Sequence, residues 1–366
     1  MRRYIVGLAA LILLIAACGG DGSTEDLSGS DTGSEITETD SADSDSGGGE
    51  SGSTGSENES TSDGTQIFVA STDGIDIVDL DAETQEVFVE GYGNPYGLIV
   101  AQDDLWFADA QNSLASVDAR SREEKGTVAL PGQFAGLSVT EDAAWVIAGL
   151  IGLDSQLVGV ERDGMTIRGT ALPPQGTYYD LVAGSGGDVW VHGGDIESST
   201  TVGKVDPVMV TVGDRVDSGV IADSMVIGLG ALWIGGTKAG SPDGSTVPVS
   251  AIAKLDPATG DVLDLLEIGG SGDDEVVVEV AFDHLWATQG LEAVLIKFDA
   301  ASGDEVGRVD VGSGAAGIPY PILLTSDAIW VVNSTDSQAL SFNPDTLDFV
   351  SGITLPYFAG TFAFVP

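Results

Sequence analysis

Acidic side chains gather in one short stretch of the chain in a pattern that could hold a metal ion. Asp273, Asp274 and Glu275 are consecutive, and Glu279 follows four residues later. Carboxylate oxygens are preferred ligands of Ca²⁺ and Mg²⁺. The spacing is not that of an EF-hand loop. The sequence therefore leaves two alternatives open: no cofactor, or a calcium or magnesium ion held by Asp273, Asp274 and Glu279.

Residues that commonly act as nucleophiles or general bases are scarce. The chain has two histidines, His192 and His284, and one cysteine, Cys18. Neither histidine has a histidine or a glutamate two residues away, and the chain contains no Gly-x-Ser-x-Gly or P-loop motif. We therefore predict no catalytic residue, and we interpret both histidines as packed or surface residues.

Cys18 ends a segment that resembles a bacterial lipobox. Two arginines precede an apolar run over 5–17, which is shorter than the roughly 20 residues needed to span a membrane. An isoleucine and two alanines stand directly before Cys18. The resemblance implies that 1–17 is a removed signal peptide and that diacylglycerol anchors Cys18 to the cell membrane. The alternative is a plain signal peptide with an incidental cysteine.

Residues 18–65 are expected to be a disordered tether. From residue 19 to residue 65 the chain carries 13 acidic and no basic residues, and it is otherwise mostly Gly, Ser and Thr. Such a composition cannot bury enough apolar surface to offset its chain entropy. The tether would hold the following domain outside the cytoplasm, at a distance from the membrane.

The charge of the whole chain excludes one class of partner. The formal net charge is −45, and residues 66–366 still hold 45 acids against 11 bases. Phosphate backbones are bound mainly by lysine and arginine, so we expect no nucleic-acid partner. We expect a monomer with an unknown protein, peptide or glycan ligand.

A repeat of about 40 residues organises 66–366. Each copy contains a short apolar strand with one large aromatic residue, namely Phe68, Trp106, Trp145, Trp190, Trp233, Trp286 and Trp330. This period with strand-like content is typical of propeller blades. An alternating strand follows each aromatic and ends in a residue expected to build a tight turn: Asp81, Asp118, Glu161, Asp206, Asp256, Asp299 or Asn343.

Each full repeat predicts four strands, which we call a, b, c and d. In the second copy they are expected at 98–101, 105–108, 114–118 and 126–130. The first copy lacks strand a, and the C-terminal segment 357–365 has the pattern of one. We therefore predict an all-β, seven-bladed β-propeller, closed by pairing of the C-terminal strand with the three N-terminal strands.

Aromatic residues recur at the predicted junctions between one strand d and the next strand a. The candidates for a ligand-binding rim are Tyr96, Phe134, Tyr179, Tyr320 and Phe358. Aromatic rings bind sugars, peptides and protein anchors well. The alternative is that these rings pack between neighbouring blades.

The repeats resemble a known group of propellers. The strand Leu-Trp-(Val/Ile) followed by Ile-x-x-(Leu/Phe)-Asp-x-x-(Thr/Ser)-Gly is similar to YVTN-type and streptogramin-lyase-like (YncE-like) seven-bladed propellers. The lyases hold magnesium among paired histidines and glutamates, and that set is missing here. We therefore expect a binding scaffold that uses one face of the ring. The alternative is a divalent-cation-dependent lyase- or lactonase-like enzyme with carboxylates at the channel mouth.

The lipobox generates a direct prediction. Replacing Cys18 by Ala removes the thiol that would carry the lipid, so the protein should move from the membrane fraction to the soluble fraction. Cell fractionation followed by immunoblotting measures this. Membrane retention of Cys18→Ala would contradict lipid anchoring.

Overall fold

The structure is a computed structural model that describes residues 66–79, 84–150, 155–173, 178–185, 187–194, 200–238, 247–270, 274–315, 320–355 and 362–364. All regular secondary structure in these ranges is β-strand, and they contain no helix long and apolar enough to cross a membrane. The expected signal peptide, Cys18 and the expected tether lie outside the described residues.

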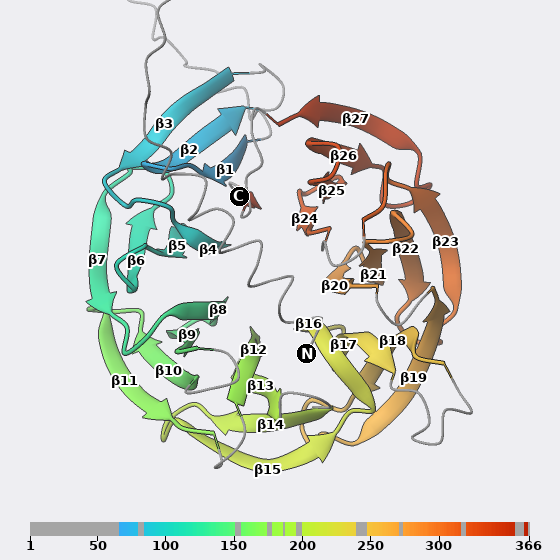
Figure 1. Cartoon of the computed structure of the whole chain (residues 1–366), viewed down its shortest axis with the longest axis horizontal. Coiled ribbons are helices and arrows are strands. Elements are labelled where there is room, and N and C mark those ends of the chain that lie inside the picture. Colours follow the sequence, from blue (N-terminus) through green and yellow to red (C-terminus); the bar gives the residue numbers. More distant parts are fainter. Residues whose placement is uncertain are drawn as a thin grey trace, which may run out of the picture. The chain divides into compact units, whose positions relative to one another are not determined.

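Seven four-stranded antiparallel sheets form a ring, as Figure 1 shows. The first three blades in chain order are blade 1, with β1 (Gln66–Ala70), β2 (Gly74–Asp79), β3 (Thr84–Glu90) and the C-terminal β28 (Phe362–Phe364); blade 2, with β4 (Tyr96–Ala101), β5 (Asp104–Ala108), β6 (Ser113–Asp118) and β7 (Glu124–Ala129); and blade 3, with β8 (Phe134–Val139), β9 (Ala143–Ala148), β10 (Gln156–Glu161) and β11 (Thr166–Ala171).

In the remaining four blades the strands follow the chain order from the centre of the ring outwards. They are blade 4, with β12 (Tyr178–Ser185), β13 (Asp188–Gly194), β14 (Thr201–Asp206) and β15 (Thr211–Asp217); blade 5, with β16 (Val220–Gly228), β17 (Ala231–Lys238), β18 (Val249–Leu255) and β19 (Val262–Gly269); blade 6, with β20 (Val276–Ala281), β21 (His284–Gln289), β22 (Val294–Asp299) and β23 (Glu305–Asp310); and blade 7, with β24 (Ile322–Leu324), β25 (Ile329–Asn333), β26 (Gln338–Phe342) and β27 (Phe349–Thr354).

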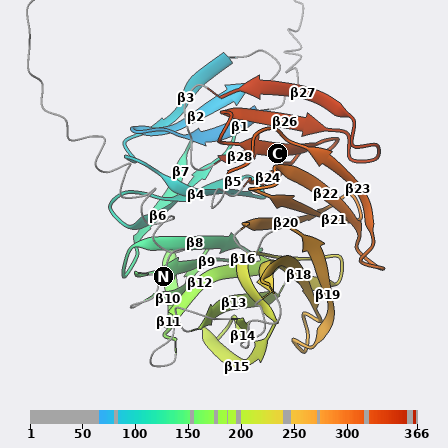
Figure 2. The same ribbon diagram turned by 45° about the vertical axis from the view of Figure 1, so that its right-hand side comes forward.

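The C-terminal strand closes the ring as the repeats predict. β28 pairs antiparallel with β1, and Phe68 lies opposite Ala363 in the register. Figure 2 shows β28 beside β1, with which it pairs. Closure gives the first blade its innermost strand and leaves no unpaired inner edge there. The predicted seven-bladed propeller is confirmed.

The core consists of seven apolar layers, one between each pair of neighbouring blades. The aromatic residue of each strand b lies in the layer shared with the next blade. All seven are at most 5 % exposed. They are Phe68, Trp106, Trp145, Trp190, Trp233, Trp286 and Trp330.

Most of the expected turn residues build the connection between strands c and d. The Asp118 carboxylate accepts the backbone N–H groups of Ser121 and Arg120, which lowers its pKa to about 2. The same arrangement occurs at Asp206, Asp256, Asp299 and Asn343. Asp81 lies outside the described residues.

The expectation is wrong for Glu161. Its carboxylate accepts the Thr166 hydroxyl and lies 3.7 Å from Arg168, instead of receiving the backbone N–H groups of its own turn. A glutamate is one methylene longer than an aspartate, so it does not close this turn in the same way. The carboxylate is therefore free to pair with a cation on the neighbouring strand.

Lysines on strand c tie three pairs of blades together. Each lies directly opposite the strand-b tryptophan of its own blade. Each ammonium group donates to a backbone carbonyl in the c–d turn of the next blade. The contacts are Lys204 to Pro257 at 2.9 Å, Lys254 to Ala300 at 2.6 Å and Lys297 to Pro344 at 2.7 Å.

Lys297 gives a test of this link between blades. It is 7 % exposed, and its Nζ lies 5.5 Å from the centre of the Trp286 ring. Lys297→Met keeps the apolar stem but leaves the Pro344 carbonyl without its donor. The free energy of unfolding should fall by about 1.5–3 kcal/mol, measured by chemical denaturation.

Lys238→Met is the matched control. Lys238 pairs with Glu267 at 2.5 Å on the surface, where an ion pair contributes about 0–1 kcal/mol. Equal losses in the two variants would contradict a specific role for the buried lysine between the blades.

Candidate functional site

Two of the aromatic rim candidates are buried. Tyr179 and Tyr320 are 1 % and 0 % exposed. The Tyr179 hydroxyl donates to the Leu172 carbonyl at 3.4 Å, and the Tyr320 hydroxyl donates to the Ser313 carbonyl. Because neither ring reaches the surface, both serve inter-blade packing in this structure, which is the alternative left open by the sequence.

Two further rim candidates, Tyr96 and Phe134, contact each other across neighbouring blades. Tyr96 and Phe134 are partly buried, and their rings stack with centroids 6.2 Å apart and planes at 19°. This pair joins strand a of blade 2 to strand a of blade 3, and part of its surface is accessible to solvent. Phe358 lies outside the described residues.

The candidate metal ligands are only partly described. Asp273 lies outside the described residues, whereas Asp274 is 1 % exposed and its Oδ1 accepts the Leu291 N–H at 2.5 Å. Burial raises the pKa of Asp274, and its Oδ2 has no partner among the described residues. The described ranges contain no group of three or more His, Cys, Asp or Glu side chains arranged to hold a metal ion.

Glu279 lies on β20, the innermost strand of blade 6 (Figure 1). Its carboxylate accepts the N–H of Val280, its own neighbour, at 2.9 Å. Burial raises the pKa of Glu279 to about 7. The carboxyl group therefore changes charge near neutral pH.

The two histidines do not meet. His192 is buried on β13 in blade 4. His284 begins β21 in blade 6, where its Nδ1 lies 2.5 Å from the Phe282 carbonyl oxygen. The structure therefore places them in separate blades, as packed and partly buried side chains.

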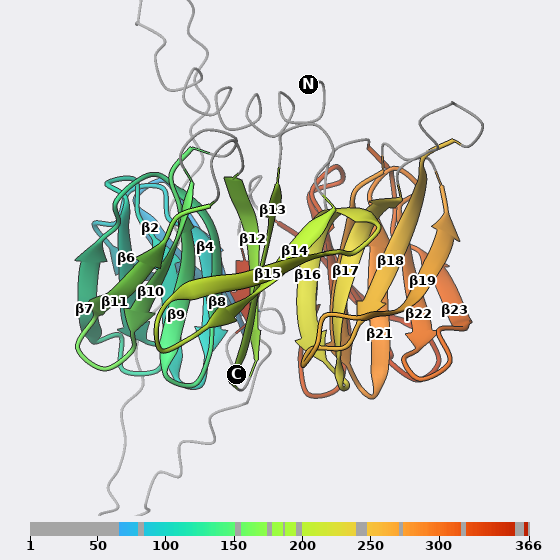
Figure 3. The same cartoon turned by 90° about the horizontal axis from the view of Figure 1, so that it is seen from below.

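A cavity of about 750 Å³ opens between blades 3 and 4. We call it the groove. Its lining comes from the a–b and c–d turns of both blades, together with β11, so it lies on one face of the ring; Figure 3 shows the ring from the side, with the strand ends marking the two faces. The groove is lined by Thr140, Glu141, Asp142, Glu161, Arg162, Asp163, Arg168, Gly187, Val189 and Pro207.

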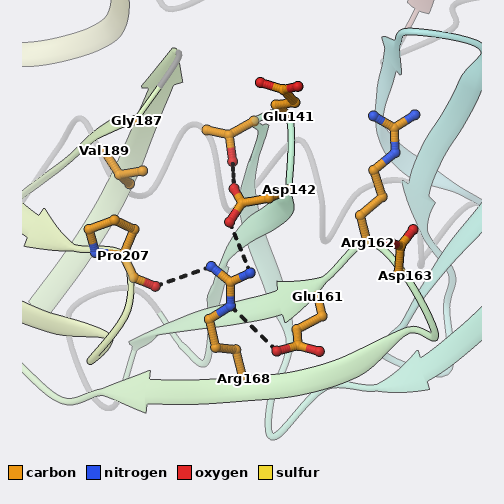
Figure 4. A pocket seen from close by; sticks show the side chains of 10 residues that line it. Glu141, Asp142, Glu161, Arg162, Asp163, Arg168, Gly187, Val189 and Pro207 are labelled. Carbon is orange, nitrogen blue, oxygen red and sulfur yellow. Dashed lines mark hydrogen bonds and ion pairs between the residues drawn. The ribbon is translucent and has the colours of Figure 1, made fainter.

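Arg168 joins the two blades inside the groove. Its guanidinium donates to Asp142 Oδ2 at 3.0 Å and to the Pro207 carbonyl at 3.2 Å. Its Nε lies 3.7 Å from Oε1 of Glu161, and Figure 4 shows these three contacts converging on one side chain. Arg168 therefore uses its donors on groups of the protein itself.

Arg162 forms the inner part of the lining. Its Nε and Nη2 donate to Asp104 Oδ2 at 3.1 and 2.7 Å, so its charge is balanced by blade 2. Its Nη1 is buried and has no hydrogen-bond partner among the described residues. A smaller cavity of about 320 Å³ shares Thr140, Glu141 and Arg162 with the groove and extends to Ala101 and Gln102 of blade 2.

Two carboxylates in the groove are unpaired. Glu141 and Asp163 are exposed, and within the described part of the chain neither contacts a hydrogen-bond donor or a cation. In Figure 4 Glu141 lies at the top of the view and Arg162 at the right, whereas Arg168 lies below Asp142. Because both arginines are already engaged by carboxylates, the groove has an excess of negative charge.

The groove residues were not predictable as a site from the sequence. Four turns from two blades build them into one site, and no local motif connects those turns. One signal was present: Arg162 and Arg168 are two of the 11 basic residues in 66–366 and flank the same turn. In a chain with so few basic residues, two arginines this close together indicate neighbouring carboxylates whose negative charge they neutralise.

The fold is that of known propellers, but the sequence is distant from them. A protein from Lactobacillus plantarum has a TM-score of 0.62 at 16% identity, over 83% of this chain and 99% of that one. Kuenenia stuttgartiensis hydrazine synthase has a TM-score of 0.60 at 13% identity, over 77% and 95%. Apo AztD from Citrobacter koseri has a TM-score of 0.53 at 13% identity, over 82% and 98%.

At such low identity these likenesses show the fold alone. No family model matches the chain, and no curated protein matches it significantly.

Glu279 gives a prediction for stability against pH. Its pKa is raised from 4.5 to about 7 in the folded state, so the folded state holds this proton more tightly than the unfolded state. The tighter proton binding at Glu279 therefore contributes fully to the free energy of unfolding below pH 4.5, and this contribution is lost as the pH rises through about 7. Glu279→Gln should gain stability relative to the native chain between pH 5 and pH 8, by up to about 3 kcal/mol.

Guanidinium unfolding of both chains at the two pH values measures this difference. Comparing the variant with the native chain removes the contribution of Asp274, whose raised pKa acts in the same direction. The same stability difference at both pH values would contradict the assignment.

Proposed function

We propose that the protein is a lipid-anchored, extracytoplasmic propeller of the YVTN or streptogramin-lyase-like kind that binds a ligand or partner protein through one face of its ring. The observation that carries the proposal is the groove: a cavity of about 750 Å³ on one face, lined by charged side chains of blade 3 and by Gly187, Val189 and Pro207 of blade 4. A volume of this size lies within the range of known ligand-binding clefts.

The rigidity of the ring supports a binding role. The groove residues stand on turns between buried strands, and the blades on either side share an apolar layer that includes Trp145 and Val210. Binding groups held on a rigid framework lose little freedom when a ligand binds. The lipobox-like segment and the acidic segment after it support a position outside the cytoplasm at the end of a tether.

A divalent-cation-dependent enzyme is the second candidate. The buried Asp274 carboxylate, with one oxygen unpartnered, and the raised pKa of Glu279 favour it, because perturbed carboxyl groups gather at functional sites. A saturable rise in melting temperature with Ca²⁺ or Mg²⁺, abolished by EDTA and by Asp274→Asn, would support this candidate over a pure scaffold.

Gly187 allows the groove to be blocked without changing a charge. It lines the groove, and nothing lies within 4 Å of the Cβ that a larger residue would place there. Gly187→Trp should therefore fold and fill the groove. Gly93→Trp is the matched control, because the nearest atom to its added Cβ is the Thr72 carbonyl oxygen at 3.8 Å.

The full chain and both variants would be melted with a panel of glycans, cell-wall fragments and peptides of different charge. A ligand at a hundredfold its dissociation constant adds about 2.7 kcal/mol to the stability. We expect a panel member to stabilise the native chain and Gly93→Trp but not Gly187→Trp. Equal stabilisation of all three chains would place binding outside the groove and contradict the proposal.

A further inference from the structure

We propose that the groove binds a basic segment of a partner protein, with a lysine or arginine side chain between blades 3 and 4 and an apolar side chain on the turn beside it. This inference rests on the proposed binding function and adds the chemistry of the partner.

Three other blade junctions of the same ring contain a lysine where the groove junction has none. Between blades 4 and 5, 5 and 6, and 6 and 7, a lysine of strand c places its ammonium group on a carbonyl of the next c–d turn. The equivalent strand-c position in blade 3 is Gly159, which lies opposite Trp145 in the register. The junction that forms the groove therefore lacks this amine, as do the junctions after blades 1, 2 and 7, where Ile77, Ser116 and Ser341 lie opposite the strand-b aromatic residue.

At the groove junction a valine and an arginine take the place of the lysine. Val210, in the c–d turn of blade 4, packs over Gly159 and Gly169, where an added Cβ would come within 3.3 and 3.0 Å of its side chain. The Pro207 carbonyl is reached by Arg168 from the outer strand β11 instead. This arrangement satisfies the carbonyl but leaves Glu141 and Asp163 without a cation.

The basic side chains of the propeller are too few to pair with all of its acidic ones. All 11 basic side chains of 66–366 lie in the described residues, and each is engaged within the propeller, for example Lys125 with Asp104 and Arg308 with Glu305. The remaining contacts are made by Arg120, Arg122, Arg162, Arg168, Lys204, Arg215, Lys238, Lys254 and Lys297. Within the described residues no basic side chain is therefore left over for Glu141 and Asp163, and a protein cation that pairs with them would belong to another molecule.

Exposed apolar side chains beside the groove favour a polypeptide over a small cation. The c–d turn that contributes Pro207 continues with Val208 and Met209, which are 77 % and 69 % exposed. Ile167, next to Arg168 on β11, is 42 % exposed. Apolar side chains beside an acidic groove fit a segment that carries both charged and apolar residues, whereas a metal ion or a polyamine would leave them in water.

The test is binding of short fluorescent peptides to the full chain at low ionic strength, followed by fluorescence anisotropy. One peptide contains lysines and leucines; in a second the lysines are acetylated, and in a third serines replace the leucines. The first peptide should bind at least about tenfold more tightly than the second, which lacks the lysine charges. It should bind measurably more tightly than the third, which lacks the apolar leucine side chains.

Two double variants locate the site. Glu141→Gln with Asp163→Asn removes the unpaired groove carboxylates and should weaken the lysine–leucine peptide by at least about fivefold. Glu90→Gln with Asp310→Asn removes the same charge from exposed positions in blades 1 and 6, and the affinity should stay within about twofold. Gly187→Trp should abolish binding without altering any charge.

Equal losses in the two double variants would overturn the inference, because they would show diffuse attraction to an acidic surface. Equal binding of the leucine and serine peptides, or full competition by spermidine, would overturn it in favour of a small cation. Groove-dependent binding of only an acidic or uncharged ligand would overturn it and leave the proposed binding function intact. If no ligand depends on Gly187, the inference and the proposed function both fail.

Discussion

The contact between each strand-b aromatic residue and the next blade is the constraint on which the whole ring depends. Seven large rings, from Phe68 to Trp330, are buried in seven inter-blade layers. Removing such a ring from a packed layer costs about 3–5 kcal/mol. Because the layers form a closed series, the angle between any two blades is limited by all the others. A charged groove can then open between two blades without loosening them.

The scarce basic residues serve the same purpose. In a domain with 45 acids and 11 bases, the lysines of blades 4 to 6 lie next to tryptophan rings and reach the following turn. A buried carbonyl and an ammonium group satisfy each other more strongly than two neutral groups would. In blade 3 the equivalent strand-c position is Gly159, and at the groove Arg168 reaches the Pro207 carbonyl from the outer strand instead.

The repeat made the fold predictable, because one period carries the strand pattern, the aromatic residue and the turn aspartate together. The expected strand 105–108 became β5 (Asp104–Ala108), and the C-terminal segment closes the ring. The site was not predictable in the same way. Whether Tyr179 faces a ligand or a neighbouring blade depends on packing between repeats, and the groove combines turns that are distant in sequence. Glu161 matched the turn position by sequence, but its longer side chain pairs with Arg168 instead.

The central claim is that a partner binds the face formed by the a–b and c–d turns, at the junction of blades 3 and 4. Hydrogen–deuterium exchange on the full chain, with and without the lysine–leucine peptide, tests it most directly. Slower exchange is predicted in the turns that contain Glu141, Asp163 and Gly187, because the bound peptide would cover them. Protection confined to the opposite face, around Tyr96 and Asp274, would contradict the account.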